Sequence, residues 1–215
     1  PLIQSALKED IGRGDITSQA IVSPSFCGKA EIVAEEEGIL AGVELAKEVF
    51  RLVSSNKVEF SYSLKDGDIL VKGEPILIAK SETLNILKGE RTALNFLSRL
   101  SGIATLTKKY VDLTHPHKIK ILDTRKTTPN LRLLEKYAVK IGGGFNHRFA
   151  LDDEVLIKDN HIKVSGGVKE AVERVRRGVS PLKKIEVEVD GLSQVEEALV
   201  AKVDIIMLDN MSVKE

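Results

Sequence analysis

Two short apolar runs of this chain each end abruptly in charged and polar residues. Ile119–Leu122 is followed by Asp123-Thr124-Arg125-Lys126, and Val155–Ile157 is followed by Lys158-Asp159-Asn160-His161. A glycine triplet, Gly142-Gly143-Gly144, lies between the two runs. Fixed positive charge at strand ends, close to bare backbone, is typical of sites that hold small polyanions. We therefore expect this part of the chain to bind an anionic small molecule.

The cations of this region differ in what their positions indicate. Arg125 and Lys126 could bind a carboxylate or phosphate, or they could be ordinary exposed loop cations. Lys158 ends an apolar run, so its stem should be buried and its ammonium confined to the mouth of the strand, which favours a functional role. His147 and Arg148 follow the glycine triplet, and the histidine could be structural or could join the pocket. The triplet would either form a tight turn or let the backbone approach a ligand, and its spacing does not match a dinucleotide-binding fingerprint.

Acidic residues alternate with valines in the run KIEVEVD, which begins at Lys184. Glu186, Glu188 and Asp190 should share one face of a strand, with the valines on the other. Acids on a buried face repel one another unless cations, a metal or hydroxyl groups face them, and salt bridges to nearby lysines are the plainer alternative. Asp209 also ends an apolar run. Acids opposite a cationic wall would suit sugar hydroxyls, Mg²⁺ or a developing carbocation, so the combination points to glycosyl transfer from a phosphorylated sugar.

The elements that must position these residues alternate between strand and helix. Such alternation predicts a parallel sheet or barrel, in which the active site is built at the C-terminal ends of the strands. Only four strands are visible in the sequence, so a barrel would not close within this chain. The predicted strands are Ile119–Leu122, Val155–Ile157, Lys184–Val189 and Asp204–Leu208, and the predicted helices are Asn130–Val139, Gly167–Arg177 and Ser193–Ala201.

The preceding part of the chain has a different pattern, that of a small, turn-rich sheet with one short amphipathic helix. The predicted strands there are Ala30–Val33 and Val58–Tyr62, and the predicted helix is Glu44–Val53. A long helix should follow over Ser81–Leu106, weakened by Gly89 and open to a break at Gly102.

Arg91 on that long helix should fall between Leu84 and Leu87, inside the apolar stripe. A long cation on a core-facing stripe needs a partner. It could pair within the chain or extend its charge to solvent along an apolar stem. Alternatively, Arg91 could reach an anion across an interface.

Composition narrows the classes of function. The chain has 215 residues and a formal net charge of zero, so no overall field draws it to nucleic acid or to an anionic membrane. Six Phe, three Tyr and no Trp also disfavour a nucleic-acid binder. No apolar run approaches the length of a membrane span. The single cysteine, Cys27, excludes an internal disulfide and a thiolate metal cluster, and we expect a cytoplasmic protein.

Several runs of the sequence closely resemble the quinolinate phosphoribosyltransferase family, the carboxylating nicotinate-nucleotide pyrophosphorylases. They are LKEDIGRGDITSQAI, AEIVAEEEGILAGVELAKEVF, ERTALNFLSRLSGIAT, LDTRKTTPNLRLLEKYAVKIGGGFNHRFALDDEVLIKDNHI, EVEVD and DIIMLDNMS, and together they cover essentially the whole chain. The resemblance implies an α/β fold. An N-terminal α/β sandwich over residues 1–106 would end in the long helix. An incomplete, open α/β barrel over residues 107–215, truncated at its C-terminus, would carry the active site.

The resemblance also implies a reaction of de novo NAD biosynthesis. Quinolinate and phosphoribosyl pyrophosphate would give nicotinate mononucleotide, pyrophosphate and carbon dioxide. Mg²⁺ would be held mainly through phosphoribosyl pyrophosphate, near Glu188 and Asp209, without direct protein ligands. Lys126, Glu188 and Asp209 would be catalytic. The substrate-binding residues would be Arg91, Thr124, Arg125, Lys126, His147, Arg148, Lys158, Glu188 and Asp209.

Two further features follow from the same resemblance. Arg91 would enter the site of the neighbouring subunit, which implies a homodimer and leaves room for a higher oligomer. The family's Ser-Gly-Gly loop and its later glycine-containing loop, which bind the 5′-phosphate, do not follow Glu215. Because Pro1 is also not an initiator methionine, we expect this chain to be part of a longer protein.

Two other functions stay open. A relative of the family found with molybdenum transport would use phosphoribosyl pyrophosphate with another acceptor. A regulatory protein could have kept the anion pocket and lost the chemistry, although simple anion capture has no use for the opposing acids Glu188 and Asp209.

Overall fold

The computed structural model describes residues 1–214 and divides into two compact units. The first comprises Pro1–His147, and the second begins at Arg148. The division suggested by the sequence, after residue 106, falls inside a helix of the first unit and stays a prediction about domains. Among residues 1–214, no helix combines the length and the apolar character needed to cross a membrane.

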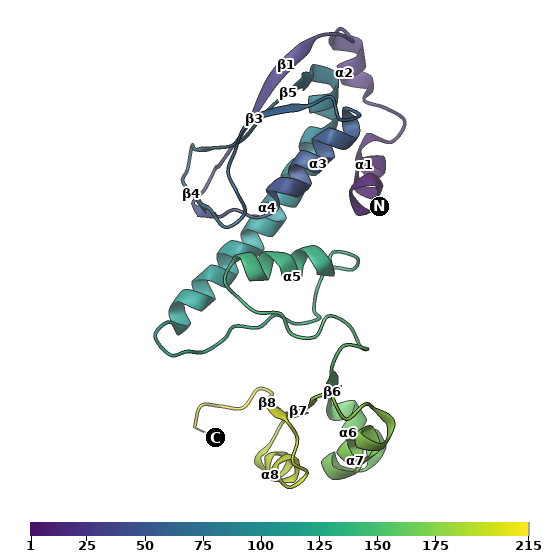
Figure 1. Cartoon of the computed structure of the whole chain (residues 1–215), viewed down its shortest axis with the longest axis vertical. Helices are drawn as coiled ribbons and strands as arrows, with labels where there is room; N and C mark the ends of the chain where they lie inside the picture. Colours follow the sequence, from purple (N-terminus) through teal and green to yellow (C-terminus); the bar gives the residue numbers. More distant parts are fainter. Residues whose placement is uncertain (215) are drawn as a thin grey trace. The chain divides into compact units, whose positions relative to one another are not determined.

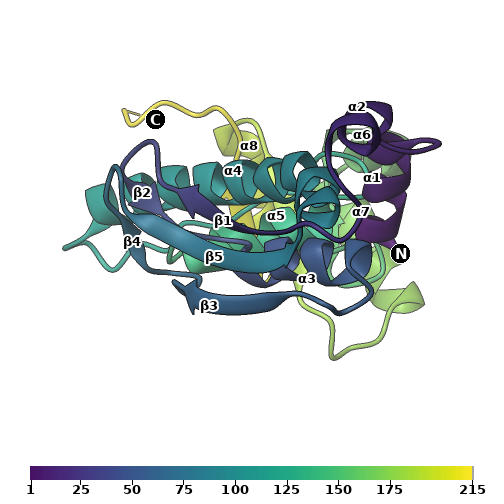
Figure 2. The ribbon, with the colours of Figure 1, turned by 90° about the horizontal axis from the view of Figure 1, so that it is seen from above.

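The first unit combines helices with an antiparallel sheet. Its helices are α1 (Leu2–Ile11), α2 (Ile16–Ile21), α3 (Val43–Val53), α4 (Thr83–Thr114) and α5 (Arg132–Ile141), and its strands are β1 (Cys27–Val33), β2 (Gly38–Ile39), β3 (Glu59–Ser63), β4 (Ile69–Leu70) and β5 (Pro75–Glu82). The main sheet has the order β1-β5-β3, and β2 pairs separately with β4. The sheet packs on α4, and α3 runs beside α4 (Figures 1 and 2). The α/β character predicted from the sequence is confirmed.

Helical periodicity explains how α3 closes the core of this unit. Val43, Ala46, Val49 and Phe50 are all buried on α3, at the spacing of a single helix face. They join residues of β5 and α4 in one apolar cluster. The sequence prediction of this helix and of strands β1 and β3 is therefore confirmed, with shifts of a few residues at their ends.

Helix α4 is longer than the sequence predicted, because Gly102 does not break it. Gly102 is exposed, and the buried stripe continues beyond it through Ala104 and Thr107. The same stripe corrects the prediction for Arg91. The buried residues of its N-terminal half include Ile86 and Ala93, whereas Arg91 is exposed and makes no ion pair with any residue from 1 to 214. Arg91 therefore lies outside the apolar stripe, contrary to the sequence prediction.

The glycine triplet brings α5 against α4. A Cβ atom on Gly142 would lie 2.7 Å from Thr107 Cβ and would also meet the backbone oxygen of Ala104. Gly143 has a φ of 88°, and a Cβ on Gly144 would lie 2.8 Å from Val139 Cγ1. The triplet therefore forms a tight turn after α5 and permits a close approach of two helices, which are the two properties that only glycine combines.

Gly142→Ala should destabilise the protein by about 1–3 kcal/mol, because the added methyl group overpacks the contact between α4 and α5. Gly102→Ala is the matched control. Its Cβ would meet nothing within 4 Å, and alanine is the better helix former by about 1 kcal/mol. In thermal melts, the melting temperature of Gly142→Ala should be lower than that of the wild type, and the melting temperature of Gly102→Ala should be higher. A Gly142→Ala variant as stable as the wild type would contradict this packing.

The second unit alternates strand and helix. Its elements are β6 (Val155–Ile157), α6 (Asp159–Ser165), α7 (Val168–Gly178), β7 (Ile185–Val189), α8 (Leu192–Val200) and β8 (Ile205–Leu208). The three strands form a parallel sheet in the order β6-β7-β8. Val187 and Val189 are buried against the helices, as the alternation in KIEVEVD predicted. All three strands predicted in this unit are confirmed.

Two elements differ from the sequence prediction. The strand predicted over Ile119–Leu122 is wrong, since this segment forms only an isolated parallel bridge from Leu122 to Phe145. The bridge consists of two hydrogen bonds, from Phe145 N to Ile121 O (2.8 Å) and from Asp123 N to Phe145 O (3.1 Å). The segment from Asp159 to His161, for which the sequence predicted no helix, begins helix α6 directly after β6.

Candidate active site

Three of the predicted site residues follow or end the parallel strands of the second unit. Lys158 follows β6, Glu188 lies near the end of β7, and Asp209 follows β8. Leu156 pairs with Glu186, and Glu188 pairs with Met207. Because side chains alternate along a strand, Lys158, Glu188 and Asp209 share the face of the sheet opposite the helices. This is the C-terminal edge, where α/β proteins of this type place their active sites.

An ion pair connects two of these residues. Lys158 Nζ donates to Glu188 Oε2 at 2.5 Å. The Glu188 side chain is 18% exposed, and the Lys158 side chain is 40% exposed, so the ammonium is less confined than the sequence suggested. From the sequence alone, salt bridges to lysines are the plainer explanation for the acids on β7. Glu188 does form such a salt bridge, with Lys158. Asp209 is exposed, and its backbone N–H donates to Val189 O at 2.9 Å.

Arg148 is a further cation of the second unit. It is buried, with only 6% of its surface exposed, and Nη1 donates to the backbone oxygen of Glu154 at 3.2 Å. A buried guanidinium needs hydrogen-bond acceptors for several donors, and one of these is supplied by the loop that leads into β6.

The other predicted site residues belong to the first unit. The loop from Thr124 to Lys126 follows Leu122 in the chain. His147 follows Phe145, the residue that forms the β-bridge with Leu122. Thr124 and Lys126 are exposed, and Thr124 Oγ1 accepts from Lys126 N at 3.0 Å. Arg125 is half-buried, and within residues 1–214 its buried Nε has no hydrogen-bond partner. A buried donor without an acceptor is uncommon, and an anionic ligand would satisfy it.

Helices α4 and α5 hold this loop through Arg99, Arg132 and Glu135, none of which the sequence pattern marks as functional. Arg99 on α4 pairs with Glu135 and donates to Thr128 Oγ1. Glu135 Oε2 accepts from Thr128 N at 3.2 Å. Arg132 Nε donates to Thr127 Oγ1 at 3.1 Å. The backbone that follows Lys126 is thus tied to two helices.

A second buried contact of α5 also escaped the sequence analysis. Lys136 is only 2% exposed, pairs with Asp123 and donates to the backbone oxygen of His147 at 3.0 Å. In the sequence, this ion pair could be suspected only from a carboxylate at the end of an apolar run and a lysine inside an amphipathic helix. Helical periodicity normally assigns such a lysine to solvent.

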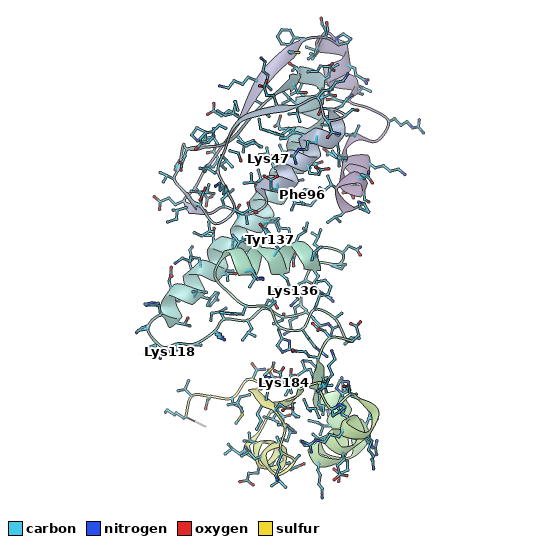
Figure 3. The ribbon with its side chains drawn as sticks, in the orientation of Figure 1. Lys47, Phe96, Lys118, Lys136, Tyr137 and Lys184 are labelled. Carbon is cyan, nitrogen blue, oxygen red and sulfur yellow. The ribbon has the colours of Figure 1, made fainter. Side chains whose placement is uncertain are left out.

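Two ionisable groups on α5 have shifted pKa values. Burial alone would raise the pKa of Glu135, but hydrogen bonds from Arg99 and Thr128 outweigh it and lower the pKa. Burial, together with a 2.6 Å hydrogen bond to Asp66 and the charge of that carboxylate, raises the pKa of Tyr137 from its ordinary value of 10 to about 12. Tyr137 and Lys136 extend from different sides of α5 (Figure 3).

The raised pKa of Tyr137 predicts a pH-dependent contribution to stability. A pKa that is higher in the folded state than in the unfolded state favours folding below pH 10, and this contribution disappears as the pH rises from 10 to about 12. Tyr137→Phe should lower the unfolding free energy by about 1 kcal/mol at neutral pH and should flatten its decline in that alkaline window. Urea melts at several pH values measure both effects.

Tyr62→Phe is the matched control, because the Tyr62 hydroxyl makes no hydrogen bond within residues 1–214. An alkaline decline of equal slope in the wild type and the Tyr137→Phe variant would show that Tyr137 does not cause it.

The donor set suits Mg²⁺ bound in part through a substrate. Within residues 1–214, no group of three or more His, Cys, Asp or Glu side chains is placed to hold a metal. Glu188 and Asp209 offer carboxylate oxygens on one face of the sheet, with Asp209 open to solvent. Mg²⁺ commonly takes one or two carboxylates and completes its shell with water and phosphate oxygens.

The predicted site residues thus fall into two groups, each within its own unit. Arg91, Thr124, Arg125, Lys126 and His147 belong to the first unit, and Arg148, Lys158, Glu188 and Asp209 belong to the second. The second group occupies one face and one edge of a parallel α/β sheet, apart from Arg148 on the preceding loop. Cations and acids in that position are typical of α/β proteins that bind an anionic ligand at the strand edge.

Comparison with known proteins identifies the family. Residues 15–101 match the N-terminal domain of quinolinate phosphoribosyl transferase, and residues 103–215 match its C-terminal domain. The chain belongs to the quinolinate phosphoribosyl transferase family.

Individual relatives agree with this assignment. The probable carboxylating nicotinate-nucleotide pyrophosphorylase of Bacillus subtilis is 49% identical over 209 residues, covering 97% of this chain and 72% of that protein. The Mycobacterium leprae enzyme of the same name is 42% identical, covering 98% and 75%. The structure of nicotinate-nucleotide pyrophosphorylase from Ehrlichia chaffeensis superimposes with a TM-score of 0.95 at 42% identity, covering all of this chain and 77% of that one.

Proposed function

We propose that this chain transfers phosphoribosyl from phosphoribosyl pyrophosphate to quinolinate and decarboxylates the product to nicotinate mononucleotide, as the names of its relatives indicate. The observation that carries the proposal is the group of Lys158, Glu188 and Asp209 on one face of the parallel sheet, with Lys158 and Glu188 in direct contact. A cation paired with one acid, with a second acid on the same face of the sheet, is suited to a reaction in which an anion leaves a sugar that becomes positively charged.

The first step is displacement at the anomeric carbon. The cations predicted to bind quinolinate fix its two carboxylates, which brings the ring nitrogen up to the sugar. The nitrogen forms a bond to the anomeric carbon as the bond to pyrophosphate breaks, and pyrophosphate leaves with the electron pair. Glu188 and Asp209 stabilise the positive charge that develops on the ribose. Mg²⁺ held near Glu188 and Asp209, mainly through the phosphates of the substrate, would supply positive charge for the leaving pyrophosphate.

The second step is loss of carbon dioxide. The ring nitrogen is cationic after ribosylation, and its positive charge stabilises the electron pair that stays on the adjacent ring carbon when the carboxylate there leaves as carbon dioxide. The ring carbon then takes up a proton, which gives nicotinate mononucleotide. The cations around the remaining carboxylate hold the ring in place throughout.

An assay of both products tests this function. The protein is incubated with phosphoribosyl pyrophosphate, Mg²⁺ and either quinolinate or nicotinate, and pyrophosphate and carbon dioxide are measured. We expect both products with quinolinate and neither with nicotinate. Binding of phosphoribosyl pyrophosphate without turnover of either acceptor would refute the assignment and favour a relative with another acceptor.

We also propose a homodimer in which the exposed Arg91 contributes to the neighbouring site. In a mixture of Arg91→Ala and Glu188→Gln subunits, the mixed dimer would contain one site with both residues intact. Random pairing then restores about a quarter of the wild-type activity, although each variant alone is inactive. The absence of any recovery, with mixed dimers demonstrated by differential tagging, would show that Arg91 acts within its own subunit or not at all. The single cysteine supports a cytoplasmic location.

A further inference from the structure

Lys136 is the largest fully buried side chain of the described structure. It extends from α5 (Figure 3). It pairs with Asp123, whose side chain is also buried. Nothing in the proposed reaction requires either charge. A buried ion pair of this kind usually adds little net stability compared with neutral residues of similar volume. Its presence therefore needs an account other than stability.

The pair holds the backbone of His147 from both sides. Lys136 Nζ donates to His147 O at 3.0 Å, and Asp123 Oδ1 accepts from His147 N at 2.9 Å. The neighbouring Asn146 completes the cluster. Oriented to satisfy its partners, its amide nitrogen donates to Asp123 Oδ2 at 2.8 Å and to Lys136 O at 3.0 Å.

The same pair connects the two segments of the first unit that carry predicted substrate-binding residues. Asp123 directly precedes Thr124, Arg125 and Lys126 in the chain, and His147 is the last residue of this unit. Apart from this cluster, the main connection between the segments is the short bridge around Leu122 and Phe145. A short bridge fixes a register poorly, whereas charged hydrogen bonds have demanding geometry.

We infer that Asp123 and Lys136 are positioning residues, which set the relative placement of His147 and the Thr124–Lys126 loop for binding the carboxylates of quinolinate. This inference rests on the proposed function. Neither residue touches the substrate. A loop displaced by about 1 Å would still allow folding, but it would weaken binding where the ligand is held by fixed cations.

Two double variants test the inference. Asp123→Asn with Lys136→Met replaces the pair by neutral groups of similar size, which should preserve the fold, but it removes the donor to His147 O. Asp123→Asn with Lys136→Gln is also neutral and keeps a donor. We expect the methionine variant to raise the KM for quinolinate about 10- to 100-fold, with the KM for phosphoribosyl pyrophosphate changed less than about 3-fold. The glutamine variant should recover part of the loss.

Lys108→Met with Asp112→Asn is the control for removing an ion pair, because that pair is exposed on α4. It should leave both KM values unchanged. Equal KM values for quinolinate in the methionine variant and the wild type would overturn the inference. So would an equal rise in both KM values accompanied by a large fall in melting temperature, since that pattern indicates a general structural role.

Hydrogen exchange separates this inference from the proposed function. If the wild type does not turn over quinolinate, the proposed function fails, and the role of the pair is then read from the amides of Phe145 and His147. We expect their exchange to be at least about 10-fold faster in the methionine variant, because the local opening free energy falls. Unchanged exchange would refute the positioning role independently of catalysis.

Discussion

Glu188→Gln lowers kcat by about 100-fold or more in the assay with quinolinate, because a neutral amide cannot stabilise the positive charge that develops on the ribose. The magnitude follows from the known effect of removing one preorganised electrostatic group from an active site, which is about 100- to 1000-fold. The substitution preserves the shape of the side chain. It leaves Lys158 without its partner, but Lys158 is 40% exposed, so its ammonium can be solvated and stability should change little.

Asp159→Asn provides the matched control for Glu188→Gln. Asp159 lies directly after Lys158 but is exposed at the start of α6. Removing its charge should leave kcat within about 3-fold of the wild type, as expected for a surface carboxylate with only a weak partner. A Glu188→Gln enzyme with a kcat similar to that of this control would remove Glu188 from the chemistry.

Asp123→Ala should lower the unfolding free energy of the first unit by about 3–5 kcal/mol, because it leaves the buried ammonium of Lys136 without its counter-charge. All three tyrosines, Tyr62, Tyr110 and Tyr137, belong to that unit, and the chain has no tryptophan. Tyrosine fluorescence in a urea titration therefore follows the first unit by itself.

The exposed ion pair between Lys108 and Asp112 on α4 also provides the control for Asp123→Ala. Asp112→Ala removes the partner of Lys108 at the surface and should lower the unfolding free energy by less than about 1 kcal/mol. The neutral pair Asp123→Asn with Lys136→Met should recover most of the stability lost in Asp123→Ala. A loss of similar size in Asp123→Ala and Asp112→Ala would mean that the buried pair is solvated in solution.

The sequence predicts the secondary structure of the second unit better than that of the loop that follows α4. The difference arises because a local pattern of apolar residues is not sufficient to form a strand. Val155–Ile157 is a short apolar run bounded by charge, and it forms the predicted strand to the residue. Ile119–Leu122 has the same pattern but finds only one bridge partner, so it does not form a strand. Periodicity shows that a segment can enter a sheet, whereas strand formation also requires a neighbour that the local pattern does not reveal.

Arg91 and Lys136 illustrate errors of opposite kind. Leu84 and Leu87, which flank Arg91 around the helix, predict that it lies in the apolar stripe of α4, but the buried stripe runs through Ile86 and Ala93 instead. Lys136 received no role because a helical lysine is usually exposed. Its burial depends on a carboxylate 13 residues away in the chain and a backbone oxygen 11 residues away. Such contacts arise from tertiary structure and leave only a weak trace in the local sequence.

The continuity of α4 has a mechanical consequence. Arg91 and Arg99 lie on one unbroken helix. Arg99 donates a hydrogen bond to Thr128 and forms a salt bridge with Glu135. At about 1.5 Å per residue, the helix fixes the two arginines about 12 Å apart along its axis. In the proposed dimer, helix α4 of one subunit presents Arg91 to the site of the neighbouring subunit. The same helix holds the loop around Thr128 in its own subunit through Arg99. A displacement of this helix along its axis would therefore move Arg91 and the Arg99 contacts together.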